Sequence, residues 1–275
     1  MRLLALIMTS ALALPAMAAA QTLPALPTLD ETPAQRTVRR AAMTPPVLQE
    51  DTALQAAIGS AARPAADVVR DAYRHPFETL TFWGLTPGST IVEIQPGAGG
   101  WWSAILRPYA EATGGTYVAV NRPQDGTGVA DGTADIVVVA RSVHGWHRGG
   151  RTDAILAACF KSLKPGGVLA VEQHRSVDGL NPDLTAPTGY MPESYVIRAA
   201  EAAGFVLEAR SELNANPKDD RDHPYGVWTL PPTRTSAPRQ GVATDRPTPL
   251  TEAERAEFDA IGESDRMTLR FRKPG

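Results

Sequence analysis

The segment 90–100, which reads TIVEIQPGAGG, constrains the fold more than any other part of this chain. A short run of β-branched and apolar residues leads through Glu93 into a glycine-rich turn. This order is typical of a strand whose carboxyl end turns sharply, so that backbone N–H groups face a ligand at the start of the next helix. The segment therefore predicts a nucleotide-type cofactor site, with Gln95 where a first glycine is usual.

Strand-like apolar segments alternate with helical patterns from this segment to the end of the chain. Apolar periodicity and flanking turn residues predict six strands and a weaker seventh. The strands are expected at 90–94, 116–120, 135–140, 168–172, 205–212 and 267–272, and the weaker one at 227–230. Helices are expected between most of them, and Pro108 should kink or shorten the one that carries Trp102 and Tyr109.

Several residues mark helix ends. Pro192 and Gly204 bracket a helix at 193–203, Thr152 is a candidate cap for the next helix upstream, and 251–254 is a candidate capping box. The alternation predicts an α/β fold with a mostly parallel sheet and helices on both faces. No clear crossover precedes the final strand, so we expect it to run antiparallel at or near an edge.

The first twenty residues have the pattern of a secretory signal peptide, with a basic start, an apolar core and small residues at the end. An uncleaved anchor is the alternative, but the apolar core is short for a bilayer span. We therefore expect export to the periplasm or secretion. Residues 21–50 are expected to form a Pro-rich flexible leader, 51–275 the folded domain, and 231–249 a Pro-rich insertion in it.

Composition excludes some classes of partner. Hydrophobic residues make up 43% of the chain and the formal net charge is −3, so there is material for a core but no basic surface for nucleic acid. The single cysteine, Cys159, shares a helical face with Leu156, Phe160 and Leu163. It is expected to be a buried structural thiol, with a reactive thiol as the alternative.

Three motifs in chain order resemble the class I S-adenosylmethionine-dependent methyltransferases. They are the glycine loop at 92–99 (VEIQPGAG), the fourth strand at 131–138 (DGTADIVV) and the turn into the fifth at 163–169 (LKPGGVL). The chain is most similar to a group of exported bacterial predicted methyltransferases, through RHP at 74–76, VHGW at 143–146, NANPK at 214–218, GVWTLPP at 226–232 and GESDRM at 262–267. The resemblance implies a Rossmann-like methyltransferase sheet and S-adenosylmethionine as the cofactor.

The chain departs from that family in three places. Gln95 replaces the first glycine of the loop, so the turn must accept a side chain. Asn121 stands where an acid usually binds the ribose hydroxyls. The segment 121–133 has no apolar period and is too short for a crossover helix and a strand, so the third strand should be missing.

The candidate ligand-binding residues follow the strands, because ligands of open α/β sheets bind beyond the strands' carboxyl ends. The cofactor-binding candidates are Glu93, Gln95, Pro96, Gly97, Gly99, Asn121, Arg141 and Ser142. The substrate candidates are Tyr73, Arg74, His75, Trp101, Arg175, Asn214 and Asn216. For each of these a structural role is the alternative, such as a surface salt bridge for Arg74. One of Trp101 and Trp102 is expected to lie in the core, and the other is expected to cap the site.

The catalytic candidates are His144, His174 and Trp146. Either histidine could act as a base, because histidine titrates near neutral pH, and the indole could pack against the substrate or the sulfonium. The histidines with His147, or the Asp131/Asp135 region, could also hold a metal ion, but no cysteine pair or dense acid cluster supports this and no metal is expected.

Two functions remain open at this stage. One is an exported methyltransferase acting on an unknown small molecule or envelope component. The other is a non-catalytic periplasmic binding protein that keeps the methyltransferase fold, since S-adenosylmethionine is made in the cytoplasm.

Overall fold

The computed structural model describes residues 50–242 and 244–275. The expected signal peptide at 1–20 and nearly all of the leader at 21–50 lie outside the described residues. Within those residues, no helix is both long enough and apolar enough to cross a bilayer.

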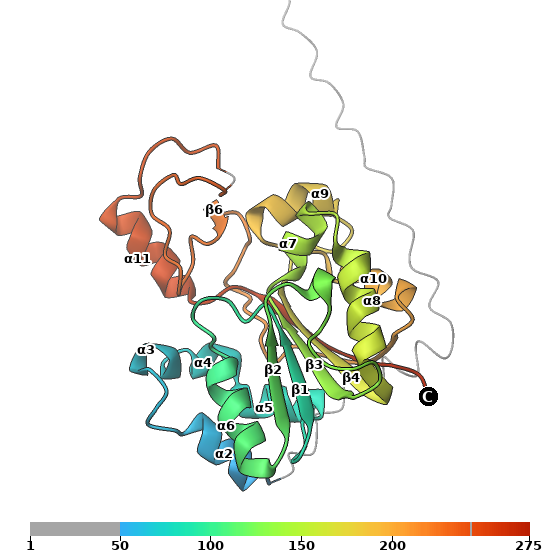
Figure 1. Cartoon of the computed structure of the whole chain (residues 1–275). Helices are drawn as coiled ribbons and strands as arrows, with labels where there is room; N and C mark the ends of the chain where they lie inside the picture. The colour runs from blue at the N-terminus through green and yellow to red at the C-terminus, as the bar shows by residue number, and fades with distance from the viewer. Residues whose placement is uncertain (1–49, 243) are drawn as a thin grey trace, which may run out of the picture. The chain divides into compact units, whose positions relative to one another are not determined.

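A six-stranded sheet in the order β2-β1-β3-β4-β7-β5 forms the centre of the described domain (Figure 1). Strands β1, β2, β3 and β4 run parallel, whereas β7 is antiparallel to its neighbours β4 and β5. The fold class predicted from the sequence is confirmed, including the antiparallel final strand near an edge. The strand bounds are β1 Thr90–Ile94, β2 Thr116–Val120, β3 Ala134–Ala140, β4 Leu163–His174, β5 Val206–Ser211 and β7 Arg266–Arg272.

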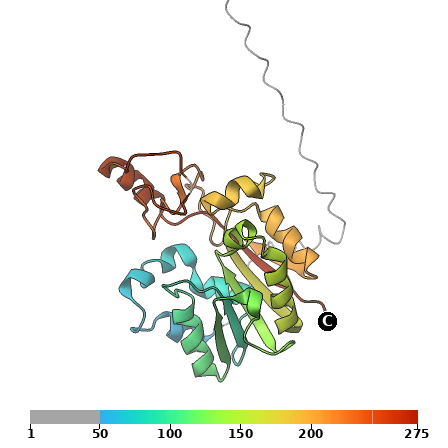
Figure 2. The same ribbon diagram turned by 45° about the horizontal axis from the view of Figure 1, so that its top comes forward.

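Helices cover both faces of the sheet (Figures 1 and 2). Apolar side chains of α2 (Thr52–Ile58), α5 (Pro76–Trp83) and α6 (Ser103–Thr113) pack on the face that carries Ile91 and Val138. Those of α7 (Val143–Arg148), α8 (Thr152–Ser162) and α10 (Glu193–Ala202) pack on the face that carries Val92 and Val139. Burial on both faces explains why the central strands are continuous apolar runs.

The remaining elements are short or lie outside the sheet. They are α3 (Ala65–Val68), α4 (Asp71–Arg74), η1 (Pro123–Asp125), α9 (Pro182–Thr185), η2 (Ala186–Thr188), β6 (Pro224–Val227) and α11 (Glu252–Ile261). The expected capping box of α11 is present, with Thr251 and Glu254 exchanging hydrogen bonds.

The third strand is missing, as predicted. Within 121–129 the chain forms only the short helix η1, and β2 is the outermost strand on that side of the sheet. Pro123 and Thr127 are buried, and a Cβ on Gly128 would lie 3.1 Å from Val118 Cγ1. A close-packed irregular segment therefore replaces the crossover helix and strand.

Three local predictions need correction. The cap of α8 is Arg151, because Thr152 is already helical and its Oγ1 accepts a hydrogen bond from the Tyr195 hydroxyl. Helix α6 continues past Pro108 to Thr113, since its apolar face is buried against the sheet on both sides of the proline. The weak strand expected at 227–230 lies earlier, at β6, and outside the main sheet.

Candidate functional site

The residues that follow β1 and β3 both have a strained backbone. Gln95 has φ 49° and Arg141 has φ 58°, in the left-handed region that glycine favours. Each donates its backbone N–H across to the neighbouring strand, Gln95 to Val120 O and Arg141 to Glu172 O, both at 2.7 Å. Such strain costs on the order of 1–3 kcal/mol per residue and clusters at functional sites. Both strained residues lie at the switch point of the sheet, where β1 has β2 on one side and β3 on the other.

The glycine loop, residues 96–100, follows Gln95 directly. Gly97, Ala98 and Gly99 are exposed, and among the described residues their N–H groups have no acceptor. A Cβ on Gly97 or Gly99 would meet no atom within 4 Å. Gly97 needs its glycine for a φ of 75°, but Gly99 has no such requirement. Packing within the protein does not explain Gly99, so the loop leaves room for the close approach of a ligand.

Gln95 connects the glycine loop to helix α7. Its Oε1 accepts a 2.7 Å hydrogen bond from Trp146 Nε1, and its Nε2 donates to Asn121 O at 3.4 Å. Trp146 is 1% exposed and lies in the core. The expectation that this indole contacts substrate is therefore wrong, because its ring faces the core and its N–H is used to fix the loop.

Glu93 lies beneath the loop and is buried. Its Oε2 accepts hydrogen bonds from Ser103 Oγ at 2.7 Å and from the Tyr117 hydroxyl at 2.6 Å. Burial raises the pKa of Glu93, and the bonds from Tyr117 and Ser103 offset this only in part. Glu93 therefore joins β1, β2 and the start of α6, and the geometry gives its carboxylate a structural part in holding the loop.

Two other cofactor candidates differ in accessibility. Asn121, which follows β2, is exposed, so its side chain is free to meet a ligand. Ser142 precedes α7 and its Oγ donates to Ala140 O at 3.2 Å, within its own turn. Pro96 is half-buried at the start of the loop.

A second set of charged side chains lies at the ends of β3 and β4 and the start of β7, and we call it the arginine–glutamate network. Glu172 at the end of β4 contacts Arg141 and Arg266, each at 3.0 Å, and accepts a bond from Trp102 Nε1 at 3.2 Å. Glu263 accepts bonds from Arg70, Arg74 and Arg266 at 2.7–2.8 Å. Its members are Arg70, Arg74, Arg141, Glu172, Glu263 and Arg266.

Cations dominate this network. Burial alone raises the pKa of Glu172, but Arg266 and Arg141 outweigh it and keep the pKa below its usual value. In the same way Arg266 and Arg74 outweigh burial at Glu263 and lower its pKa to about 2. Both glutamates are therefore ionised at neutral pH, and each is shared by at least two arginines.

Most of the predicted substrate residues are held inside the protein, which corrects those predictions. Arg74 is 2% exposed and stacks on Trp101, with its Cζ 4.8 Å from the ring centroid. Trp101 is itself buried and donates to Asp67 O, so both tryptophans of the pair are core. Arg74 Nε donates to Glu263 and Trp101 Nε1 to Asp67 O, whereas Arg74 Nη1 has no partner among the described residues.

Asn214, Asn216 and Arg175 also bond internally. Asn214 donates to Thr79 and Thr268, Asn216 donates to the carbonyls of Ile261 and Glu263, and Arg175 binds Asp265 and Glu212. Their polar atoms fix the chain between β5 and β7 instead of facing a substrate.

His75 and Tyr73 lie at the break between α4 and α5. His75 has φ 40° and its Nδ1 lies 3.2 Å from Asn214 Oδ1. Tyr73 is 43% exposed, and its ring covers Gly262 so closely that a Cβ there would lie 2.5 Å from Tyr73 Cε1. Tyr73 is thus the one predicted substrate residue with a largely exposed side chain.

The two candidate bases do not titrate near neutral pH. Burial lowers the pKa of His144 to about 4, and burial with nearby cations lowers the pKa of His174 well below its usual value. Both imidazoles are neutral at pH 7. The expectation that either is a base poised at working pH is wrong, because desolvation disfavours the imidazolium.

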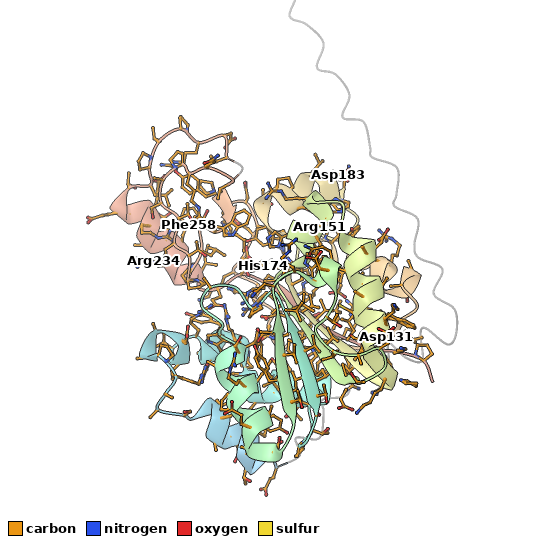
Figure 3. All side chains as sticks on the ribbon, in the orientation of Figure 1. Asp131, Arg151, His174, Asp183, Arg234 and Phe258 are labelled. Atoms are coloured by element: carbon orange, nitrogen blue, oxygen red, sulfur yellow. The ribbon has the colours of Figure 1, made fainter. Side chains whose placement is uncertain are left out.

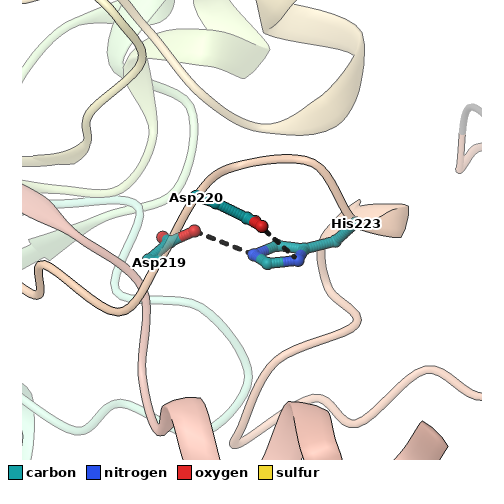
Figure 4. A group of neighbouring side chains, drawn as sticks. All are labelled: Asp219, Asp220 and His223. Carbon is teal, nitrogen blue, oxygen red and sulfur yellow. Dashed lines mark hydrogen bonds and ion pairs between the residues drawn. The ribbon is translucent and has the colours of Figure 1, made fainter.

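The residues considered for a metal do not meet as a group of three ligands among the described residues. His147 lies between Tyr195 and Asp183, while Asp135 accepts from Thr90 N and Lys164. In the described part of the chain, one group of three possible ligands is close together, Asp219, Asp220 and His223 (Figure 4).

The Asp219 group is a hydrogen-bond cluster. Asp219 is buried and accepts bonds from Tyr190, His223 Nε2 and the backbone N–H groups of Arg221 and Asp265. Figure 4 shows the three side chains, with Asp219 on His223 Nε2 and Asp220 near Nδ1. The two carboxylates approach different nitrogens of the ring, and the hydrogen bonds to Asp219 account for its burial.

Sequence reasoning missed Glu172, Gln173 and Ser264. Glu172 and Gln173 end an apolar strand, and acids or amides at that position are the signal that would have pointed to them. Ser264 lies within GESDRM, the segment before β7, whose polar residues all turn inward.

No family model matches the chain, and no curated protein matches it. Three solved structures show likenesses of fold. The pyocyanin biosynthetic protein PhzM is 11% identical over 75% of this chain and 55% of its own, with a TM-score of 0.41. A chain of the complex between the Haloferax volcanii Trm112 methyltransferase activator and the putative methyltransferase is 12% identical over 82% and 100%, with a TM-score of 0.41. A putative methyltransferase from Bacillus halodurans is 13% identical over 72% and 98%, with a TM-score of 0.41.

These likenesses concern the arrangement of strands and helices and say nothing about substrate. The strand order, with β7 antiparallel, is by itself that of an open Rossmann-like sheet, and in the described part of the chain no strand lies outside β2.

Proposed function

We propose that this protein is an exported, S-adenosylmethionine-dependent methyltransferase whose cofactor lies on the glycine loop after β1. The observation that carries the proposal is the open loop at the switch point of the sheet. Gly97 and Gly99 have empty space where a Cβ would lie, and the loop N–H groups have no acceptor in the described part of the chain. A site of this kind suits a ligand that the backbone must approach closely.

The residues present fit the amino acid and ribose parts of this cofactor better than its adenine. Gly97–Gly99 would contact its amino acid and ribose portions, and the exposed Asn121 amide could hydrogen-bond the ribose hydroxyls without contributing charge. Because the third strand is absent, the adenine would have only the irregular segment after Asn121 beside it. We therefore expect weaker binding than in methyltransferases with a complete sheet.

When bound, S-adenosylmethionine supplies an electrophilic methyl group on a sulfonium. The protein needs to align the acceptor with that methyl and to exclude water. Gln95 and Trp146 hold the loop in a fixed conformation, and Glu93 anchors it to β2 and α6.

Export and the acceptor are part of the proposal. The basic start, apolar core and small residues of 1–20 support export, and a small molecule or an envelope component is the expected acceptor.

A thermal-shift series with S-adenosylmethionine and S-adenosylhomocysteine tests the proposal. A ligand at 100 times its dissociation constant stabilises a protein by about 2.7 kcal/mol, so both compounds should raise the melting temperature in a saturable way. Methylthioadenosine, which lacks the amino acid, should act more weakly. No shift at millimolar concentrations of either compound would contradict the proposal.

A further inference from the structure

His144 and His174 lie next to each other at the carboxyl ends of the central strands. His144 is in the first turn of α7 and His174 ends β4, with 6.2 Å between the ring centroids. Figure 3 shows His174 where the strands end. Trp228, which follows β6, is half-buried with its ring centroid 5.8 Å from that of His144. Three segments distant in sequence therefore meet around this pair of rings.

Gln173 determines which nitrogen of His144 carries the proton. Its Oε1 accepts a bond from Val143 N at 3.1 Å, and its Nε2 donates to Gly189 O at 3.0 Å, so the orientation of the amide is fixed. The same Nε2 faces His144 Nδ1 at 3.4 Å. Because an amide nitrogen only donates, Nδ1 must be the accepting nitrogen. The proton of neutral His144 is therefore on Nε2.

Ser264 does the same for His174. Its Oγ lies 2.6 Å from His174 Nδ1, and the serine is 3% exposed. Among the described residues this nitrogen is the one acceptor within reach of the Ser264 hydroxyl. The hydroxyl therefore donates to Nδ1, and the proton of neutral His174 is on Nε2.

Both Nε2–H groups are left available. Neither has an acceptor in the described ranges, and neither is among the buried polar atoms without a partner, so both retain accessible surface. Two donors without acceptors on neighbouring rings suit a ligand that brings acceptor oxygens.

The charged groups around the pair carry a net positive charge, because Arg74, Arg141 and Arg266 share only two buried carboxylates, Glu172 and Glu263. Arg148 and Arg141 act on His144, while Arg141, Arg266 and Arg74 act on His174. With burial, they keep both rings neutral, as their lowered pKa values indicate. The donors are thus uncharged N–H groups in positive surroundings, which attract an anion.

We propose that the Nε2–H groups of His144 and His174 form a two-donor site for an anionic oxygen group, a carboxylate or phenolate, on the methyl acceptor. Only the statement that the ligand is the methyl acceptor rests on the proposed function. The two-donor site does not depend on it. The proposal assigns the histidines to binding, because their basic nitrogens are already covered by Gln173 and Ser264.

The first test is the tautomer of each ring. The chain has five histidines, so long-range ¹H–¹⁵N spectra of histidine-labelled protein at pH 7 are readily assigned with His144→Gln and His174→Gln. Both rings should be neutral with the proton on Nε2. A proton on Nδ1 of either ring, or an imidazolium at pH 7, would overturn the proposal.

The second test uses benzoate as the probe and benzamide as its neutral counterpart. Benzoate should shift the Nε2 signals of His144 and His174, and benzamide should shift them far less. His147, which is bonded to Asp183 and Tyr195, serves as the internal control. If benzoate moves neither Nε2 signal, or moves all five histidines alike, no such site exists.

Two variants test whether benzoate binding depends on the Nε2–H donors or only on an intact fold. Gln173→Glu replaces the amide donor with an acceptor, so His144 should move its proton to Nδ1 and benzoate affinity should fall at least tenfold. Ser264→Ala removes one small hydroxyl and should weaken benzoate several-fold through His174. S-adenosylhomocysteine binding should persist in both variants. Benzoate affinity that is unchanged in folded Ser264→Ala and Gln173→Glu would overturn the proposal.

The outcomes also separate the two proposals. If S-adenosylhomocysteine binds but the tautomers or benzoate shifts fail, this site is wrong and the proposed function stands. If the benzoate site is present and S-adenosylhomocysteine does not bind, the anion site stands and the methyltransferase proposal fails.

Discussion

The glycine loop follows β1, whereas the arginine–glutamate network lies at the ends of β3 and β4 and the start of β7, and the two regions differ in how far their polar groups are exposed. In the loop, Gly97–Gly99 are exposed and offer N–H groups without acceptors in the described chain. In the network, Glu172 and Glu263 are buried and each is shared by two or more arginines. The loop has the properties of a binding surface, and the network those of a support.

This difference shows that a residue is not functional merely because it follows a strand. Arg175 follows β4 as directly as Gln95 follows β1, yet its guanidinium holds the chain between β5 and β7 through Asp265 and Glu212. The side chain of Gln95 is also bonded internally, so the exposed N–H groups of Gly97–Gly99 are what distinguish the loop. Changes in the network should therefore affect stability first, and changes in the loop should affect ligand binding first.

The largest effect is expected at Glu172. Glu172→Gln leaves Arg141 without its buried counter-charge and Arg266 with Glu263 alone, and breaking a buried pair in this way typically costs about 3–5 kcal/mol. Urea unfolding measures the loss. Glu208→Gln is the matched control, because Glu208 pairs with Arg270 and Arg272 at a half-exposed position and should cost about 1 kcal/mol or less. Equal losses in the two variants would show that the network is not a special support.

The next effect is the pH dependence of stability. The folded pKa of His144 is about 4 and its unfolded value is near 6.5, so the unfolded chain binds more protons between these values. Stability is full above pH 6.5 and falls as the pH drops toward 4, by roughly 3 kcal/mol at most. Unfolding curves from pH 7 to pH 4.5 measure the slope, and His144→Gln should reduce it. A slope unaffected by that variant would contradict the burial of His144.

How much could be predicted from the sequence depends on the distance between partners. The sheet and its missing strand follow from local patterns, such as the β-branched run at β1 and the breakers after Asn121. The open loop follows from its glycines. The internal side-chain contacts could not be predicted, because Gln95 and Trp146 are 51 residues apart and Arg74 and Glu263 are 189 apart. No local pattern shows that such side chains meet.

A moderate effect on binding is expected in the loop. Gln95→Ala leaves the buried Trp146 N–H without its acceptor, which should cost about 1–3 kcal/mol, and it frees the loop. Cofactor affinity should fall with stability. Trp146→Phe removes the donor as well, so a double-mutant cycle should show coupling between the two positions. Additive effects would mean that the 2.7 Å bond does not hold the loop.

The smallest effect on stability is expected at Gly99. Gly99→Val requires no left-handed backbone and its Cβ would meet no atom within 4 Å, so the melting temperature of the free protein should hardly change. Gly145→Ala in α7, which also meets no atom within 4 Å, is the control for a harmless side chain. A marked loss of stability in Gly99→Val would show that the loop is closed by packing.

Calorimetric titration of S-adenosylhomocysteine into the wild-type chain and into Gly99→Val tests the central claim most directly. The account predicts saturable binding to the wild type and affinity at least about tenfold weaker, or roughly 1.4 kcal/mol, in the variant, because the added side chain fills the space at the loop. Equal affinity for the two proteins, or no heat with the wild type at millimolar ligand, would contradict it.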